Sequence, residues 1–272
     1  MADQAGEAGS ADRLKSDVPH TARIWNYWLG GKDHFEVDRN VGDRVLEIFP
    51  VVAELARADR LFLGRAVRYL AGEAGLRQFL DIGTGLPTHD NTHEVAQRIA
   101  PESRIVYVDN DPLVLVHARA LLVSTPQGAS DYIEADLREP DRILDVAAQT
   151  LDFAEPVAIM LLGVMHFIQD DDELQAIIDR LVDAVPSGSH VAVANTTTAV
   201  NGELTAEAVR VWNVDAQPKL KLRTPERIAG FFRDLEVLDP GWVSCSRWRP
   251  DLGPDGGLPN EVDQWAGVLR KP

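Results

Sequence analysis

Two short motifs in this chain combine apolar runs with acidic and glycine residues. Phe79–Gly85 reads Phe-Leu-Asp-Ile-Gly-Thr-Gly, and Arg104–Asp111 reads Arg-Ile-Val-Tyr-Val-Asp-Asn-Asp. Because glycine lacks a Cβ atom, Gly83 and Gly85 let the backbone come close to a ligand. The carboxylate of Asp109, at the end of the second run, can accept hydrogen bonds from both hydroxyls of a ribose. The two motifs therefore predict a nucleoside pocket at the carboxyl ends of adjacent parallel strands.

A third apolar run, residues 132–135, leads into Asp136 and Leu137. This carboxylate could accept a hydrogen bond from an adenine amino group while Leu137 packs on the ring. Both acids also have structural interpretations, Asp109 as a helix N-cap and Asp136 as a turn residue. Asp111 is the better cap candidate because it directly precedes Pro112, which leaves Asp109 for the ligand.

The spacing of the glycines bears on the kind of nucleotide. A dinucleotide-binding turn needs Gly-x-Gly-x-x-Gly, but Thr88 stands at the third position and Pro87 precedes it. The run Gly31-Lys32-Asp33 lacks the flanking glycine and the hydroxyl residue of a phosphate-binding loop. An NAD-dependent oxidoreductase would use the same glycine-rich strand end and acid, and it stays open as an alternative.

Strand and helix patterns alternate around these motifs. We expect strands at 79–82, 104–108, 132–135, 157–162 and 190–194, and helices at 92–99, 112–122, 142–148 and 171–185. This alternation predicts an α/β, Rossmann-like, mostly parallel central sheet with helices on both faces. Later runs at 236–238, 242–246 and 265–269, with a glycine- and proline-rich loop before the last, predict an antiparallel C-terminal edge.

Residues 19–70 have helical patterns. Ile24, Tyr27 and Trp28 share one face of a helix that Gly30 and Gly31 end. Further helices are expected after a capping pair of Asp33 with Glu36, over Asp59–Ala71, near a cap at Thr205, and from Thr224 to Phe232. We expect the Asp59–Ala71 helix to bury a stripe made of Leu61, Phe62, Ala66 and Tyr69.

Acidity and a single cysteine narrow the classes of partner. The chain has 43 acidic and 27 basic residues and a net charge of −16. This balance disfavours a nucleic-acid or anionic-membrane surface. Cys245 is the single cysteine, so no intrachain disulfide can form. No apolar run approaches the roughly 18 residues of a membrane span, and residues 1–18 lack the apolar core of a signal peptide. We expect a cytoplasmic protein with a disordered N-terminus over residues 1–18.

The motifs at 79–85, 104–111, 135–137 and 161–166, in this order, resemble those of class I S-adenosylmethionine-dependent methyltransferases. Thr21–Asp33 and Asp81–Thr88 together more closely resemble one actinobacterial family of S-adenosyl methyltransferases of unassigned substrate, first catalogued as a domain of unknown function. This resemblance covers residues 19–272. Pro87, where many methyltransferases have a third glycine, departs from the general pattern and agrees with the closer family.

The resemblance implies S-adenosyl-L-methionine as the cofactor and assigns roles to the strand ends. Gly83, Thr84 and Gly85 of the glycine turn would approach the methionine portion, and Asp109 after the second strand would hold the ribose. Asn110, Asp136 and Leu137 would flank the adenine. Gly163, after the fourth strand, would lie near the sulfonium. We expect a helical lid over residues 19–70 and an S-adenosylmethionine-binding methyltransferase domain over 71–272.

The Arg23–Asp33 segment has two interpretations. It could be an ordinary amphipathic helix with a glycine stop, or a lid across the open ends of the strands. Its aromatic residues favour the lid, because an aromatic wall attracts a sulfonium by cation–π interaction. We therefore expect Arg23 and Tyr27 to contribute to the cofactor site.

Catalytic groups are less evident. His166 follows the fourth strand, where a base could reach the acceptor, although a hydrogen-bonded structural histidine is the alternative. His89 and His93 have a spacing that can bind a metal on a helix, but no third ligand is evident, so we expect no metal.

We therefore expect methyl transfer from S-adenosylmethionine to a small or medium-sized acceptor, achieved mainly by positioning. No nucleic-acid or membrane partner is expected. A non-catalytic S-adenosylmethionine-binding regulator is an alternative, because the sequence contains no strong base.

Overall fold

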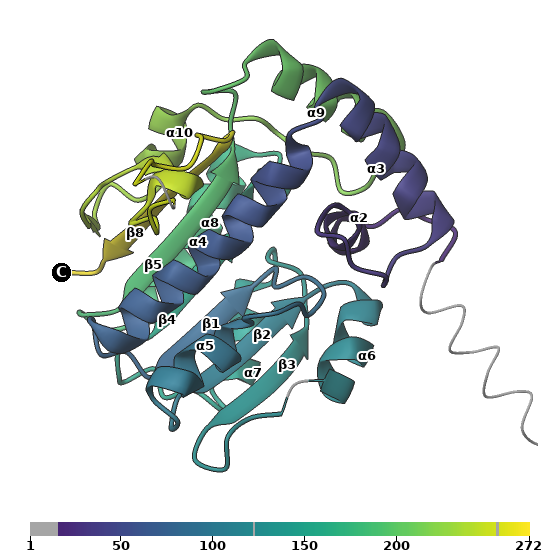
Figure 1. Ribbon diagram of the computed structural model, residues 1–272. Helices are drawn as coiled ribbons and strands as arrows, with labels where there is room; N and C mark the ends of the chain where they lie inside the picture. The colour runs from purple at the N-terminus through teal and green to yellow at the C-terminus, as the bar shows by residue number, and fades with distance from the viewer. Residues whose placement is uncertain (1–15, 122, 254–255) are drawn as a thin grey trace, which may run out of the picture.

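The computed structural model describes residues 16–121, 123–253 and 256–272. Within these residues, eight strands form one sheet in the order β3-β2-β1-β4-β5-β8-β6, with β7 paired to β8 (Figure 1). The strands are β1 (Gln78–Ile82), β2 (Arg104–Asp109), β3 (Ala129–Glu134), β4 (Ala158–Leu162), β5 (His190–Thr196), β6 (Glu236–Val237), β7 (Val243–Ser244) and β8 (Gln264–Arg270). Strands β1 to β5 are parallel, whereas β8 is antiparallel to β5. The Rossmann-like fold with an antiparallel C-terminal edge is confirmed.

Helices cover both faces of this sheet. Figure 1 shows α4 and α5 across one face, with α7 and α8 behind the other. The helices are α2 (Thr21–Trp28), α3 (Glu36–Ile48), α4 (Val52–Gly72), α5 (Thr92–Ile99), α6 (Pro112–Leu121), α7 (Pro140–Ala147), α8 (Asp171–Asp183), α9 (Glu203–Asp215) and α10 (Pro225–Gly230), with short 3₁₀ turns η2 (Met165–Phe167) and η3 (Cys245–Arg247).

The central strands are apolar because both of their faces are covered. On β1, Phe79 packs in the core under α4 and α5, and the next residue, Leu80, packs in the core under α7 and α8. Side chains alternate between the faces of a strand, so a strand with both faces covered has apolar residues at most of its positions. This explains why continuous apolar runs predicted β1, β2 and β4 well.

The N-terminal helices differ from the prediction in three details. Helix α4 begins at Val52, seven residues before the expected start at Asp59, and Leu61 is 63% exposed instead of buried. The expected capping pair of Asp33 with Glu36 is wrong. Helix α3 begins after Phe35, whose backbone N–H donates to the Asp38 carboxylate at 2.8 Å.

Two C-terminal predictions were also displaced. Thr205 does not cap a helix but lies inside α9, where its hydroxyl donates to Asp263 at 2.7 Å. The run expected as a strand over 242–246 pairs with β8 only at Val243–Ser244 and then turns into η3. The Thr224 cap of α10 is confirmed, since its hydroxyl accepts from the Arg227 N–H.

Helices α2, α3 and α9 lie beyond the carboxyl ends of the parallel strands (Figure 1). Their buried side chains, such as Ile24, Val45 and Trp212, belong to the same apolar core as Phe79 and Met160 of the sheet. The segment 19–70 therefore packs directly on the rest of the protein. Of the N-terminus expected to be disordered, residues 1–15 lie outside the described residues.

Candidate functional site

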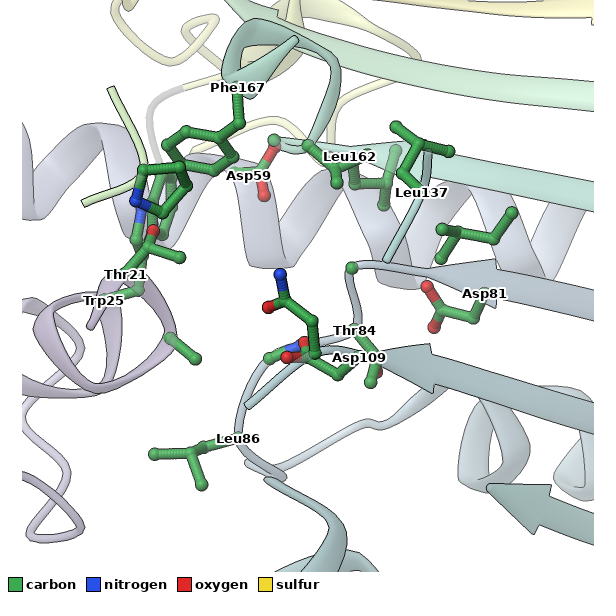
Figure 2. Close-up of a pocket in the computed structure, with 18 of the residues that line it drawn as sticks. Thr21, Trp25, Asp59, Asp81, Thr84, Leu86, Asp109, Leu137, Leu162 and Phe167 are labelled. Carbon is green, nitrogen blue, oxygen red and sulfur yellow. The ribbon is translucent and has the colours of Figure 1, made fainter. Parts of the chain in front are cut away.

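A pocket opens at the carboxyl ends of β1, β2 and β4. Figure 2 shows two of its sides: Thr21 and Trp25 of α2 lie on one, and Asp81, Thr84 and Asp109 at the strand ends lie on the other. A concave site with a few convergent polar groups at the strand ends of a parallel sheet is typical of a ligand pocket. The motifs singled out in the sequence therefore meet in one place.

The turn after β1 depends on its two glycines in different ways. Gly83 has φ +76°, and a Cβ atom added there would lie 2.8 Å from the Cβ of Val164. Gly85 has φ +67°, and nothing lies within 4 Å of the position where its Cβ would be. Both residues line the pocket. Gly83 therefore serves close packing with the segment after β4, whereas Gly85 leaves space open towards the pocket.

Asp109 lies at the end of β2 and is 7% exposed. One of its carboxylate oxygens accepts from the Gly85 N–H at 2.8 Å and the other from the Asp111 N–H at 2.9 Å. Burial raises the pKa of this carboxyl above its usual value. Each carboxylate oxygen can accept a second hydrogen bond, so Asp109 both shapes the glycine turn and keeps acceptor capacity for a ligand.

Asp111 is the N-cap of α6, as expected, because its carboxylate accepts from the Leu113 N–H at 2.9 Å. The cap interpretation of Asp109 thus loses its main support.

The residues after β3 form a second group of polar contacts. Asn110 donates through Nδ2 to Asp136 at 3.1 Å, and the Arg138 N–H donates to the same carboxylate at 2.9 Å. The Arg138 guanidinium also donates to the Phe167 carbonyl at 3.0 Å. Leu137 is buried and lines the pocket beside Asp136. The predicted adenine-flanking residues are therefore adjacent, and Arg138, which the prediction missed, ties them to η2.

Helix α4 contributes two charged residues that the sequence reasoning missed, Asp59 and Arg60. Asp59 is 7% exposed and accepts from the Gln264 amide of β8 at 3.1 Å. Arg60 donates through Nη2 to the His89 carbonyl at 3.2 Å, while its Nε atom is buried without a hydrogen-bond partner among the described residues. The pocket therefore has an acid and a cation side by side on one helix.

Two pocket acids have unusual ionisation. Burial raises the pKa of Asp59 to about 6 and that of Asp81, whose carboxylate accepts from the Thr92 hydroxyl at 2.6 Å, also to about 6. Between about pH 4 and pH 6, the folded protein therefore holds protons on Asp59 and Asp81 that the unfolded chain, with an aspartate pKa near 3.9, has lost.

We expect Asp59→Asn to gain stability relative to the unchanged protein as pH rises from about 4 to 7. The folded state binds more protons in this window, so the stability of the unchanged protein falls as Asp59 ionises, by on the order of 2–3 kcal/mol. Urea unfolding at each pH measures the difference.

The control is Asp90→Asn. The hydrogen bond from Arg98 lowers the pKa of Asp90, so the stability that Asp90 contributes is lost as pH falls, whereas that of Asp59 is lost as pH rises. A pH-independent difference for Asp59→Asn would contradict the prediction.

The two expected lid residues lie away from the pocket surface. Arg23 is 1% exposed, with its Nε atom 3.6 Å from Asp38 and 3.5 Å from Asp111, and it donates to the Val18 carbonyl at 2.8 Å. Tyr27 donates its hydroxyl to Asp43 at 2.5 Å. The pocket is instead lined by other residues of the same segment, namely Thr21, Ala22, Trp25, Asn26 and Leu29. Arg23 joins α2 to the loop after β2, so it can act on the site only indirectly.

Gly163 lines the pocket as expected, with φ +67° directly after β4. His166, three residues later, is 1% exposed and lines a second cavity. Burial and the nearby Arg223 guanidinium lower its pKa to about 3, so its imidazole is neutral at physiological pH.

His89 and His93 do not lie on one helix, as their spacing of four residues would allow. Helix α5 begins at Thr92, so His89 lies outside it, and the His93 ring lies 2.8 Å from the Tyr107 hydroxyl. Across the described ranges, no group of three or more His, Cys, Asp or Glu side chains is placed to hold a metal ion.

The strand order, the inserted antiparallel β8 and the nucleoside-type pocket define a Rossmann-like methyltransferase fold. The sequence profile of the S-adenosyl methyltransferase family matches residues 7–272. The chain belongs to this family and is a methyltransferase that uses S-adenosylmethionine.

Solved structures agree with this assignment. A DUF574 family protein from Streptomyces avermitilis is 41% identical, with a TM-score of 0.91 over 96% of this chain and 100% of its own. A candidate methyltransferase from Thermobifida fusca is 40% identical, with a TM-score of 0.86 over 95% of this chain and 97% of its own. An O-methyltransferase family protein from Burkholderia thailandensis shares the fold alone, at 16% identity and a TM-score of 0.53 over 89% of this chain and 73% of its own.

A search of curated protein sequences found no match. Among the helices that the structure describes, none combines the length and the apolar character needed to cross a membrane.

Proposed function

We propose that this protein transfers a methyl group from S-adenosylmethionine to a small or medium-sized molecule, and that it does so mainly by positioning the two reactants. The observation that carries the proposal is that one pocket is lined both by the strand ends and by α2. Trp25 and Asn26 of α2 line the same space as Gly85 and Asp109. A helix that closes a pocket excludes water and favours a compact acceptor over a polymer.

The residues present fit the cofactor. A buried carboxylate at Asp109 with remaining acceptor capacity suits a ribose, and the open space beside Gly85 suits a ligand that approaches the backbone. Asp136, Leu137 and Asn110 would flank the adenine, and Gly163 would lie near the sulfonium. When bound, the cofactor supplies an activated methyl group, whose transfer breaks the S–CH₃ bond, leaves the electron pair on sulfur and forms the bond to the acceptor.

The amino-acid end of the cofactor carries one positive and one negative group. Arg60 and Asp59 provide the complementary charges, and the buried Arg60 Nε lacks a partner among the described residues. We assign Arg60 to the carboxylate and Asp59 to the ammonium group. This assignment gives a ligand-dependent reason for a costly buried acid.

The remaining assignments follow from the same picture. The segment 19–70 would be the lid over the methyltransferase domain at 71–272, with α2 as its pocket-lining part. Arg23 would position the loop of Asp109 and Asp111 through its ion pairs. The net charge of −16 supports a small-molecule acceptor over a nucleic-acid or membrane partner. The single cysteine fits the reducing cytoplasm as the compartment.

Calorimetric titration with S-adenosylmethionine, S-adenosylhomocysteine and NAD, followed by methyl transfer to fractionated cell extract, tests the proposal. We expect micromolar binding of the two methionine nucleosides and no comparable binding of NAD, because the turn after β1 lacks the third glycine of a dinucleotide site. With a labelled methyl donor, label should enter the low-molecular-mass fraction.

Heat-denatured protein is the control for the transfer assay. Label found only in the protein or nucleic-acid fraction would overturn the small acceptor, and tight NAD binding would overturn the cofactor assignments.

A further inference from the structure

A chain of buried charges joins the N-terminal segment to the loop that follows Asp109. Arg23 of α2 is 1% exposed, and its Nε atom lies 3.6 Å from Asp38 of α3 and 3.5 Å from Asp111. Both acids are buried as well, with exposed fractions of 0% and 1%. Charges held away from water interact strongly, and removing one of them leaves the others without compensation. Each of these three side chains therefore depends on the other two.

Asp38 is the end of this chain that lies in the N-terminal segment. One of its carboxylate oxygens accepts from the His20 N–H at 2.9 Å, and the other accepts from the Phe35 N–H at 2.8 Å. The His20 ring adds a second link, because its Nδ1 atom lies 3.0 Å from the Asp111 carboxylate. The starts of α2 and α3 are therefore tied to each other and to the loop after β2.

A small apolar cluster covers these polar contacts. Its members come from α2, from the turn after β1 and from α6, and they are Ala22, Leu86, Leu113 and Val114. Phe35 packs against this cluster, and the Arg23 guanidinium lies over the Phe35 ring, 5.1 Å from its centre. Figure 2 shows Leu86 on the side of the pocket where α2 lies. The N-terminal segment thus contacts both the glycine turn and the loop after β2.

Asp111 connects this linkage to Asp109. Its backbone N–H donates to one Asp109 oxygen at 2.9 Å, and its own carboxylate accepts from the Leu113 N–H. Without the Arg23 guanidinium, the Asp111 carboxylate would carry a poorly compensated buried charge, and the loop would have to move to hydrate it. Such a movement takes the Asp111 N–H away from Asp109. Because Arg23 and Asp38 lie outside the pocket lining, their effect on a ligand runs through this path.

We propose that Arg23 and Asp38 are positioning residues for Asp109, so that the cofactor's ribose is held tightly only while the N-terminal segment is docked on the loop after β2. The inference rests on the proposed function, in which Asp109 binds the ribose. Coupling between two sites is reciprocal, so a bound cofactor in turn holds the N-terminal segment in place. Docking of this one segment then both covers the pocket and completes the ribose site.

Isothermal titration calorimetry with S-adenosylhomocysteine, applied to a double-mutant cycle, tests the proposal. Arg23→Gln removes the charge and should weaken binding to the otherwise unchanged protein by about tenfold, as expected for coupled sites. In the Asp109→Asn background, the same substitution should change the affinity by less than about twofold, because the carboxylate that it positions is absent. Arg23→Lys keeps a positive charge at this place and should recover most of the affinity.

Arg44→Gln is the matched control, because Arg44 lies on α3 and pairs with Asp215 of α9 at 2.8 Å, outside the path to Asp109. It should leave the affinity unchanged in both backgrounds. If Arg23→Gln weakened binding equally with and without the Asp109 carboxylate, its effect would be a general structural one and the proposal would be overturned. Full affinity of a folded Arg23→Gln would overturn it as well.

Amide hydrogen exchange, followed by NMR, tests the reverse direction and does not depend on a folded Arg23 variant. S-adenosylhomocysteine should slow the exchange of the His20 and Phe35 N–H groups, which donate to Asp38 and lie outside the pocket lining. Asp109→Asn at saturating ligand should lose this protection. Unaltered exchange at both positions would overturn the proposal. Failure of the unchanged protein to bind S-adenosylhomocysteine would instead overturn the proposed function, and the positioning role with it.

Discussion

Asp109→Asn is expected to weaken the binding of S-adenosylhomocysteine by a factor of about 100 or more. Hydrogen bonds to a charged group contribute about 1.5–3 kcal/mol each, and in its proposed role Asp109 accepts two from a ribose. The variant also turns an amide N–H₂ towards one of the backbone donors, Gly85 or Asp111, that the carboxylate now accepts from. Isothermal titration calorimetry measures the loss.

The control for this variant is Asp90→Asn, the same chemical change at a surface aspartate that pairs with Arg98. It should leave the affinity unchanged. Thermal unfolding of both variants shows whether Asp109→Asn still folds. A folded variant with full affinity would contradict the assignment of Asp109 to the cofactor.

Replacing each glycine of the turn after β1 with alanine should separate folding from binding. Gly85→Ala should cost only about 1–2 kcal/mol of stability, because its backbone is left-handed but no atom lies near the new methyl group. In the proposed site that methyl would project into space that the cofactor occupies, so affinity should fall by about a factor of 10 or more. Gly83→Ala adds a clash with Val164 to the same strain and should be the less stable of the two.

Gly241→Ala provides the matched control. Gly241 also has a left-handed backbone and open surroundings, with φ +90°, but it lies outside the pocket lining. It should lose a similar amount of stability to Gly85→Ala in urea unfolding and keep full affinity in calorimetry. If Gly85→Ala bound the cofactor normally, the open space beside Gly85 would not be part of the binding site.

The parts of the site that could be predicted are those formed by residues close together in the sequence. A buried strand, its glycine turn and the acid of the next strand lie within short stretches, so Gly83, Gly85 and Asp109 could be found and brought together by the parallel order of the strands. The cap at Asp111 was predictable for the same reason.

Other parts depend on how distant segments pack. Asp59 and Arg60 reach the pocket because α4 crosses the sheet and carries two charges at one point of its length. Since the helix was expected to begin at Asp59, an acid there looked like an ordinary first-turn residue. The true start at Val52 places Asp59 in the body of the helix, where a buried acid is unusual and points to function.

Residues of the segment expected to form a lid line the pocket, but they are not the side chains that the sequence singled out. Aromatic and charged residues in α2 indicated a role near the ligand, yet a helix turns each residue by a fixed angle, so only some positions face the pocket. Trp25, Asn26 and Leu29 face it, whereas Arg23 is held by Asp38 and Asp111. The sequence contains no local pattern that distinguishes these directions.

The place of β8 has a consequence for the order in which the protein is completed during translation. This strand lies between β5 and β6, and its Gln264 side chain pairs with Asp59. Until residues 264–270 leave the ribosome, the edge of β5 has no neighbour and the pocket acid on α4 has no amide beside it. The pocket of a nascent chain is therefore incomplete, and premature stops before residue 264 should yield chains that aggregate through the open edge of β5.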